Sequence, residues 1–290
     1  MKNLPVILLR LLAKLPLPVA HSIGALLGWL LILTPNKNQR IARRNLELCL
    51  PELNKTQREQ LLKKSLIETG KAVMEKGALM CWKHKRVLTL IREIVGLEYL
   101  GEAHDNDNGT ILAIPHLGDW EMIGLYCSSQ YPMTSLYRPL RGPLDDFIKT
   151  GRERLGAHLV PTEGKGLRAL YSALNKGELV AILPDQNPGA GKGIYAPFFG
   201  VAANTMVLLS RLANKTNATV LYAYAERLPH GQGFRLHFSP APDDIHNQDI
   251  HVSVTALNTG LEKCIRTLSE QYWWSYPRFR QRPGDEPPIY

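Results

Sequence analysis

The sequence predicts an α/β fold, in which helices flank a mostly parallel central sheet and a helical region comes first. Short apolar runs bounded by turn residues at 110–114, 178–183 and 219–224 predict buried strands, each preceded or followed by a helical stretch. Strands that alternate with helices form βαβ units, whose parallel sheet is covered on both faces and holds ligands at the carboxyl ends of its strands. The chain has 290 residues, 44% of them apolar, which is enough for a large core.

The first region, residues 1–36, is expected to form membrane-anchoring helices. Leucine and isoleucine recur at helical spacing over residues 4–12 beside basic residues, which is typical of a helix lying at a membrane surface. Residues 15–33 are apolar over about the length of a bilayer crossing, but Pro16 and Pro18 interrupt them and make the span marginal. A cleaved signal peptide and an ordinary pair of packed helices are the alternatives. A monotopic anchor fits the pattern best.

The second region, residues 37–94, is expected to be helical and amphipathic. Between residues 55 and 82, apolar side chains recur among charges at helical spacing, and Gly70 and Gly77 are the only weak points. The strand pattern begins after this region. Residues 95–290 are therefore expected to form the α/β domain.

Composition restricts the partners. Lys and Arg number 35 against 26 Asp and Glu, and the net charge of +9 indicates an anionic partner: nucleic acid, anionic lipid or an acidic protein. Charged residues make up 21% of the chain, which excludes a bundle of many membrane-spanning helices. The four cysteines have neither zinc-ribbon nor disulfide spacing, so reduced thiols and no metal are expected.

A histidine and two carboxylates follow the strand predicted at 110–114. The segment 115–121 reads PHLGDWE and lies at a strand-to-helix junction, where catalytic sites are commonly built. His116 and Glu121 are five residues apart and cannot share one helix face, so they meet only if His116 precedes the helix. Glu121 would then accept the Nδ1 proton of His116 and leave Nε2 free as a general base, with Asp119 as the helix N-cap. A surface hydrogen bond is the simpler alternative.

This segment resembles the H-x4-[DE] block of glycerolipid acyltransferases, in the HxGxWE form of the lipid A biosynthesis (lauroyl/myristoyl) acyltransferases. Further blocks similar to that family follow the same order over nearly the whole chain. They are RRNLELCLPE at 43–52, YRP at 137–139, LPDQNPG at 183–189, APFFG at 196–200 and WWSYPRF at 273–279. Two positions depart from the family pattern: Leu50 stands where Phe is usual, and Tyr276 where His is usual.

The resemblance implies a glycerolipid acyltransferase-like fold and an O-acyltransferase. Such an enzyme moves a fatty acyl chain from an acyl-carrier-protein thioester to a hydroxyl of a lipid A precursor glycolipid, at the cytoplasmic face of the bacterial inner membrane. His116 would act as the general base and Glu121 would fix its tautomer, without an acyl-enzyme. The absence of a G-x-S-x-G elbow agrees with this mechanism. No cofactor is expected besides the thioester co-substrate.

The resemblance and the residues extend the site beyond this segment. Arg152 aligns with a catalytic arginine of the family, and it would bind acceptor phosphate or stabilise the tetrahedral oxyanion. Asp185 follows the strand 178–183 and would lie in the same layer as His116 if the two strands are parallel neighbours, where it would orient other groups of the site or accept a hydrogen bond from a substrate hydroxyl; a turn-forming Asp is the alternative. The substrate-binding residues expected are Arg138, Arg141, Gln186 and Lys192. Lys192 lies in a glycine-rich segment that suits either a phosphate loop or a hairpin.

Other classes of protein explain less of the sequence. A binding module for nucleic acid or anionic lipid accounts for the charge and for the aromatic, arginine-rich segment 272–282, but not for the segment 115–121. The G-x-G-x-x-A match at 164–169 lacks the acidic partner of a dinucleotide site. The expected partners are an acidic acyl carrier protein, an anionic glycolipid and a membrane surface, and not nucleic acid. The closer alternative is an enzyme of the same family that acylates another glycolipid or a lysophospholipid.

Overall fold

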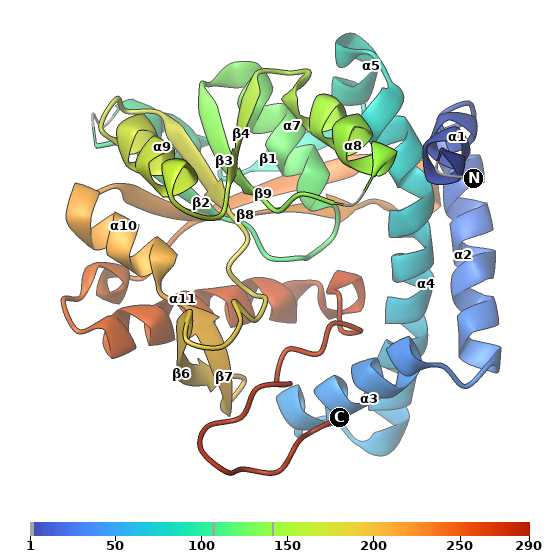
Figure 1. Ribbon diagram of the computed structural model, residues 1–290. Coiled ribbons are helices and arrows are strands. Elements are labelled where there is room, and N and C mark those ends of the chain that lie inside the picture. The colour runs from blue at the N-terminus through green and yellow to red at the C-terminus, as the bar shows by residue number, and fades with distance from the viewer. Residues whose placement is uncertain (1–2, 106–107, 141) are drawn as a thin grey trace.

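A seven-stranded sheet forms the centre of the molecule (Figure 1). The computed structural model describes residues 3–105, 108–140 and 142–290. The strands of the sheet lie in the order β1-β9-β8-β2-β5-β3-β4, and β6 and β7 form a separate antiparallel hairpin. The strands are β1 (Ile91–Val95), β2 (Thr110–Ala113), β3 (Met133–Tyr137), β4 (Ala157–Pro161), β5 (Leu179–Ile182), β6 (Gly193–Phe198), β7 (Val201–Met206), β8 (Thr219–Arg227) and β9 (Phe234–Pro240).

Neighbouring strands of the sheet are parallel except β8 and β9, which pair antiparallel. The mostly parallel sheet predicted from the sequence is therefore confirmed, and the three predicted runs are β2, β5 and β8, which lie side by side. Strand β1 was not predicted. It lies at the edge of the sheet, none of its residues is fully buried, and it therefore carries no continuous apolar run.

Helices cover both faces of the sheet. Along β2, Ile111 and Ala113 belong to the core on one face, with α9–α11, while Leu112 and Ile114 belong to the core on the other, with α5–α8. Because both faces are covered, β2 is buried at every residue. The helices are α1 (Leu4–Leu12), α2 (Leu17–Leu33), α3 (Lys37–Cys49), α4 (Lys55–Cys81), α5 (His84–Leu88), α6 (Leu97–Asp105), α7 (Trp120–Gln130), α8 (Pro143–Glu153), α9 (Lys165–Leu174), α10 (Leu208–Thr216) and α11 (Ile250–Thr267).

The helices α2 and α4 run side by side at one edge of the molecule and touch through glycine (Figure 1). A Cβ atom on Gly24 would lie 2.6 Å from the Cα of Lys71, and one on Gly70 would lie 2.1 Å from the carbonyl oxygen of Gly24. Glycine therefore lets the two backbones approach more closely than any other residue would. This contact holds the N-terminal region against α4, which also contacts the rest of the molecule.

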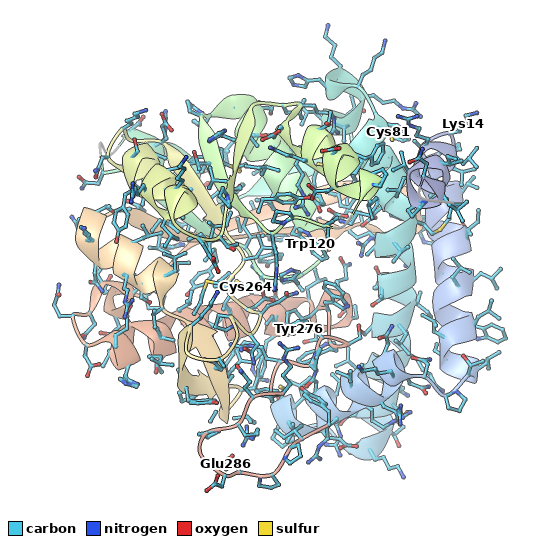
Figure 2. The ribbon with its side chains drawn as sticks, in the orientation of Figure 1. Lys14, Cys81, Trp120, Cys264, Tyr276 and Glu286 are labelled. Atoms are coloured by element: carbon cyan, nitrogen blue, oxygen red, sulfur yellow. The ribbon has the colours of Figure 1, made fainter. Side chains whose placement is uncertain are left out.

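The outer side of α1 and α2 is an exposed apolar face, and Figure 2 shows the side chains of α2 that project away from α4. In the described part of the chain no single helix is long and apolar enough to cross a bilayer; α2 and α3 meet that test only together, across a bend of 83°. We call this surface the N-terminal apolar face. It consists of Leu4, Ile7, Leu8 and Leu11 of α1 and Val19, Ile23, Leu26, Leu27, Trp29, Leu30 and Leu33 of α2.

Candidate active site

Two side chains at the carboxyl ends of neighbouring strands form the centre of the site. His116 follows β2 and Asp185 follows β5, and these strands pair in parallel. The Nδ1 atom of His116 lies 2.7 Å from Oδ1 of Asp185, and the backbone N–H of His116 donates to Oδ2 at 2.9 Å. Asp185 thus lies in the layer expected for it, buried and in direct contact with His116.

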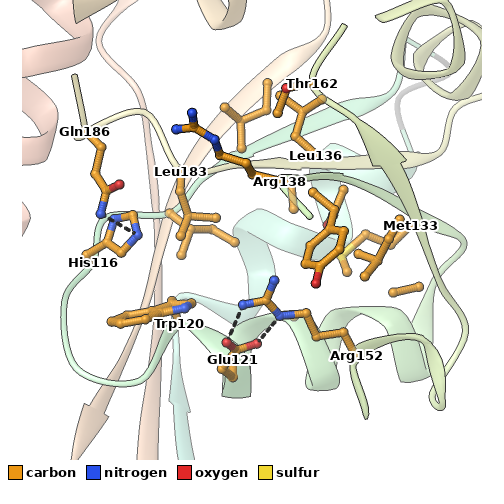
Figure 3. A pocket seen from close by; sticks show the side chains of 18 of the residues that line it. His116, Trp120, Glu121, Met133, Leu136, Arg138, Arg152, Thr162, Leu183 and Gln186 are labelled. Atoms are coloured by element: carbon orange, nitrogen blue, oxygen red, sulfur yellow. Dashed lines mark hydrogen bonds and ion pairs between the residues drawn. The ribbon is translucent and has the colours of Figure 1, made fainter. Parts of the chain in front are cut away.

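The contact with Asp185 fixes which nitrogen of His116 is basic. Burial raises the pKa of Asp185, but the electrostatic attraction and the two hydrogen bonds that His116 offers to the carboxylate outweigh burial and hold that pKa below its usual value. An ionised carboxylate only accepts hydrogen bonds, so Nδ1 carries the proton and Nε2 presents the lone pair. The side-chain amide nitrogen of Gln186 lies 3.1 Å from Nε2 and donates to it (Figure 3).

The loop between β2 and α7 is held through its backbone. Gly118 has a φ of +60°, and a Cβ atom there would lie 1.8 Å from the carbonyl oxygen of Ala225, so the position requires glycine. The backbone N–H of Asp119 donates to the same carbonyl at 2.9 Å. The side chain of Asp119 accepts from the N–H groups of Glu121 and Met122, and its prediction as the N-cap of α7 is confirmed.

Glu121 makes no hydrogen bond to His116 among the described residues, so the predicted bond between them is wrong. Arg152 of α8 binds the Glu121 carboxylate instead, through Nε at 2.8 Å and Nη2 at 2.6 Å, and Lys76 Nζ lies 3.8 Å from it. Burial raises the pKa of Glu121, but Arg152 and Lys76 outweigh burial and lower it to about 2. A bidentate guanidinium stabilises a buried carboxylate far better than a neutral imidazole does, which explains why Glu121 pairs with Arg152 and not with His116.

Aromatic rings enclose His116. The rings of Trp120 and Trp273 stack with centroids 5.7 Å apart and an interplanar angle of 9°, and their centroids lie 4.8 Å and 5.6 Å from that of the imidazole. Figure 2 places Trp120 in the middle of the molecule. Only 12% of the His116 side chain is exposed, so the rings limit the access of water to the imidazole.

Two cavities meet at these rings. The inner cavity, of about 470 Å³, extends between the sheet and α7 and is lined mostly by apolar side chains (Figure 3). The outer cavity, of about 340 Å³, lies between α4 and α8, and Leu9 of α1 and Val73 of α4 are among the residues that line it. Both volumes fall in the range of small-molecule sites. The residues that line both cavities are His116, Trp120, Glu121, Leu140, Arg152 and Trp273.

The remaining residues predicted to bind substrate divide into three groups. Arg138 and Gln186 line the inner cavity. Lys192 lies elsewhere: its Nζ is 2.6 Å from Oε1 of Glu163, both side chains are exposed, and neither lines either cavity. Arg141 lies outside the described residues. Of the three that the structure describes, Gln186 is the one that forms a hydrogen bond to His116.

Sequence reasoning missed a buried charge cluster beside the outer cavity. Arg227, at the end of β8, donates through Nε to Glu75 at 2.8 Å and through Nη1 to Glu68 at 3.0 Å. Nε2 of His21 on α2 lies 2.7 Å from the same Glu75 carboxylate. The cluster joins α2, α4 and the sheet. No local pattern could have indicated it, because the partners of Glu75 are 54 and 152 residues away in the chain.

The C-terminal segment completes the site. The Tyr276 hydroxyl accepts a hydrogen bond of 3.0 Å from the backbone N–H of Asn187, in the loop that carries Asp185 and Gln186. The backbone N–H of Trp273 donates to the carbonyl oxygen of His116 at 3.1 Å. Tyr276, which stands where His is usual in the resembling family, therefore supports the loop on which the partners of His116 lie.

The fold and the site define the class of this protein as an α/β enzyme with its centre at the carboxyl ends of parallel strands. The family model described as bacterial lipid A biosynthesis acyltransferase matches residues 2–281. The chain belongs to this family, and it is an acyltransferase of lipid A biosynthesis.

Relatives of known activity are similar over nearly their full lengths. The lipid A biosynthesis lauroyltransferase of Escherichia coli K12 is 31% identical over 284 residues, which cover 97% of this chain and 92% of the relative. The palmitoleoyltransferase of the same organism is 30% identical, with coverage of 97% and 92%. The myristoyltransferase is 24% identical, with coverage of 94% and 83%. These relatives are named for acyl chains of different kinds, so similarity alone does not fix the chain that this protein transfers.

Proposed function

We propose that this protein transfers a fatty acyl chain from an acyl-carrier-protein thioester to a hydroxyl of a lipid A precursor, with His116 as the general base. One observation carries the proposal: His116 is held at Nδ1 by Asp185, and it lies where the inner and outer cavities meet. A base in that position reaches a hydroxyl presented from one cavity and a thioester presented from the other.

The proposed reaction needs no acyl-enzyme. The acceptor hydroxyl replaces the Gln186 amide at Nε2, gives its proton to Nε2 and attacks the thioester carbonyl through its oxygen. The tetrahedral intermediate collapses when the carbon–sulfur bond breaks, and the departing thiolate takes the proton from Nε2. Asp185 keeps the imidazole in the correct tautomer and stabilises the imidazolium that forms between these steps. Asp185 thus takes the role that the sequence assigned to Glu121.

Arg152 is the proposed stabiliser of negative charge. It lines both cavities, and two of its five N–H groups bind Glu121 while the others remain available to a developing oxyanion or to an acceptor phosphate. Glu121 holds the guanidinium in place, so its part in catalysis is to position Arg152. This assignment keeps both residues in the site but separates Glu121 from the base.

The two cavities suit two different substrates. We assign the acyl chain of the donor to the inner cavity, because its walls are mostly apolar and it extends into the core. We assign the acceptor glycolipid to the outer cavity, because Leu9 and Val73 place it beside the N-terminal apolar face. A lipid lying in the bilayer reaches the base from that side without leaving its apolar surroundings. The acidic carrier protein then approaches near Arg138, which lines the inner cavity, and the net charge of +9 favours its binding.

Substitution of the base tests this function. We expect His116→Ala to slow transfer from acyl carrier protein to the lipid A precursor by roughly 10²–10⁴-fold, because the hydroxyl loses its proton acceptor. The exposed His251 of α11 supplies a matched control, and His251→Ala should keep the parent rate. A His116→Ala protein that folds and transfers at the parent rate would refute the base assignment. Mass spectrometry of lipid A from cells with and without the gene tests the acceptor, since an unchanged acylation pattern would favour another glycolipid or a lysophospholipid.

A further inference from the structure

The inner cavity extends along the sheet away from His116. Met133 and Tyr137, the first and last residues of β3, both line it, so it follows all five residues of the strand, and the four steps between them span about 13 Å. Met133 pairs in register with Ala157, the first residue of β4, which also lines the cavity. Figure 3 shows Met133 at the end opposite His116. A zigzag of carbon–carbon bonds of about 1.5 Å covers this depth with roughly ten carbons.

One wall of this cavity is a face of α7 that contains a glycine. Trp120, Glu121, Gly124 and Leu125 line the cavity, and their spacing of three and four residues puts them on the same side of the helix. A Cβ atom built on Gly124 meets no heavy atom of the described residues within 4 Å. The helix runs from the catalytic end of the sheet toward the start of β3, so Gly124 lies roughly one turn deeper in the cavity than Trp120.

Glycine inside a helix is less stable than alanine, and close packing against another backbone is one reason for its presence. Packing gives the reason in the N-terminal helices, where a Cβ on any of four glycines would lie 2.6 Å or less from another atom. Those glycines are Gly24, Gly28, Gly70 and Gly77. Packing gives none for Gly124, because the space beside it is the cavity itself.

We propose that Gly124 determines the longest acyl chain that this enzyme transfers. The inference rests on the proposed assignment of the donor chain to the inner cavity. A side chain on Gly124 would occupy the space through which a long chain passes on its way to Met133. The wall opposite is also made of small side chains, Ser135 of β3, Ala157 of β4 and Ala181 of β5, so the chain passes through the space left between these strands and Gly124.

The test compares donors of rising length on the full chain in detergent. Initial rates are measured with octanoyl, decanoyl, lauroyl, myristoyl and palmitoyl carrier protein for the parent, Gly124→Ala and Gly124→Leu. We expect the preferred chain to become shorter from the parent to Gly124→Ala and again to Gly124→Leu. The ratio of two initial rates, that with the parent's preferred chain over that with octanoyl, should be lower in Gly124→Leu than in the parent by roughly tenfold or more. Octanoyl transfer should fall less than the transfer of the longer chains, because a shorter part of the octanoyl chain passes beyond Gly124.

Gly101 of α6 supplies the matched control. It is also an interior helix glycine whose added Cβ meets nothing within 4 Å in the part of the chain that the structure describes, but it lines neither cavity. Gly101→Ala should raise the unfolding temperature, as Gly124→Ala should, and it should leave the chain-length profile unchanged. If Gly124→Ala and Gly124→Leu keep the parent profile, or lose all chain lengths equally, the inference is wrong.

A second measurement separates this inference from the proposed function. Free fatty acids that occupy the inner cavity should raise the unfolding temperature, and at equal concentration the increase is larger for the acid that binds more tightly, whether or not any transfer occurs. We expect Gly124→Leu to reduce stabilisation by palmitate more than stabilisation by octanoate. If the parent transfers no acyl chain, but substitution of Gly124 reduces stabilisation by palmitate more than stabilisation by octanoate, the proposed function is refuted and the role of Gly124 in limiting chain length is supported. Equal stabilisation of the parent and Gly124→Leu by palmitate would refute the role of Gly124.

Discussion

His116 and Glu121 belong to one seven-residue segment, yet each is held by a residue from a distant part of the chain. Asp185 binds His116 from the end of a neighbouring strand, and Arg152 binds Glu121 from α8. Spacing along the chain shows only that two side chains five residues apart are able to meet ahead of a helix. It does not show which carboxylate binds the imidazole, because that depends on the charged side chains of other helices and strands. The contact between Asp185 and His116 therefore leads to a prediction about the rate of transfer.

We expect Asp185→Asn to lower kcat by roughly a hundredfold or more and to change KM little. The amide removes the charge that stabilises the imidazolium and allows the other tautomer, while it preserves the shape of the side chain. The measurement is steady-state transfer from acyl carrier protein, with circular dichroism to verify the fold. In a double-substitution cycle, Asp185→Asn should cost little further rate once His116 is Ala, because the two act as one unit. Full additivity would show that Asp185 acts independently of His116.

The Glu121–Arg152 pair predicts a dependence of stability on acid. The pKa of Glu121 is lowered to about 2 from 4.5, so the folded state favours the ionised form. Its contribution is fully present above about pH 4.5 and is lost as the pH falls toward about 2. We expect Glu121→Gln to reduce the free energy of unfolding by roughly 3 kcal/mol at neutral pH, because it leaves Arg152 without its partner charge. Urea unfolding between pH 7 and pH 2 measures the difference, which should shrink with acid; a constant difference would contradict the assignment.

At the scale of the elements, the strands that the sequence predicted are those buried on both faces. The runs that became β2, β5 and β8 are apolar because helices cover both of their sides, and α4 was recognised from its apolar spacing. The edge strand β1 carries charges among partly exposed residues and gives no such signal. The contact between α2 and α4 could not be predicted either. A glycine in a helical pattern indicates a weak point in the helix, and its role in close packing is recognised only when the neighbouring backbone is known.

The glycines between α2 and α4 give the prediction at this scale. A Cβ on Gly28 would lie 2.4 Å from the carbonyl oxygen of Leu66, and backbone cannot yield as a flexible side chain does. We expect Gly28→Ala to lower the free energy of unfolding by about 1–3 kcal/mol, despite the better helix propensity of alanine. Gly101→Ala, which meets no atom, should instead raise it by about 0.5–1 kcal/mol. Chemical unfolding in detergent measures both; a stabilised Gly28→Ala would show that the helices are not packed this closely.

At the scale of the whole molecule, α1 contributes both to the N-terminal apolar face and to the wall of the outer cavity. Leu9 of α1 and Val73 of α4 line the cavity, and neighbouring residues of α1 belong to the face. The buried cluster of His21, Glu75 and Arg227 connects α2 through α4 to the end of the strand that supports Asp119. We infer that the face rests in the bilayer and turns the mouth of the outer cavity toward its lipids.

Membrane binding tests that orientation apart from catalysis. We expect Leu8→Asp combined with Leu11→Asp to reduce binding to vesicles of anionic lipid by at least roughly tenfold, because burial of one leucine is worth about 1.5–3 kcal/mol. The matched control replaces Leu97 of α6 and Val252 of α11, which are also exposed apolar residues but lie outside the face, with Asp. That control should bind vesicles as the parent does. High salt should also weaken the binding of the parent to these vesicles, since basic residues beside an anionic surface contribute about 1 kcal/mol each.

The variant that combines Leu8→Asp with Leu11→Asp also distinguishes access of the acceptor to the site from the chemical step. Leu8 and Leu11 line neither cavity, so their replacement leaves His116, Asp185 and the walls around them intact. We expect the variant to acylate a detergent-dispersed acceptor at the parent kcat and to lose transfer to the same acceptor embedded in vesicles. If transfer falls equally in both assays, the face supports the fold of the site and not its position on the membrane. If vesicle transfer persists without vesicle binding, the acceptor does not enter from the bilayer side. The orientation therefore depends on the contrast between the two assays.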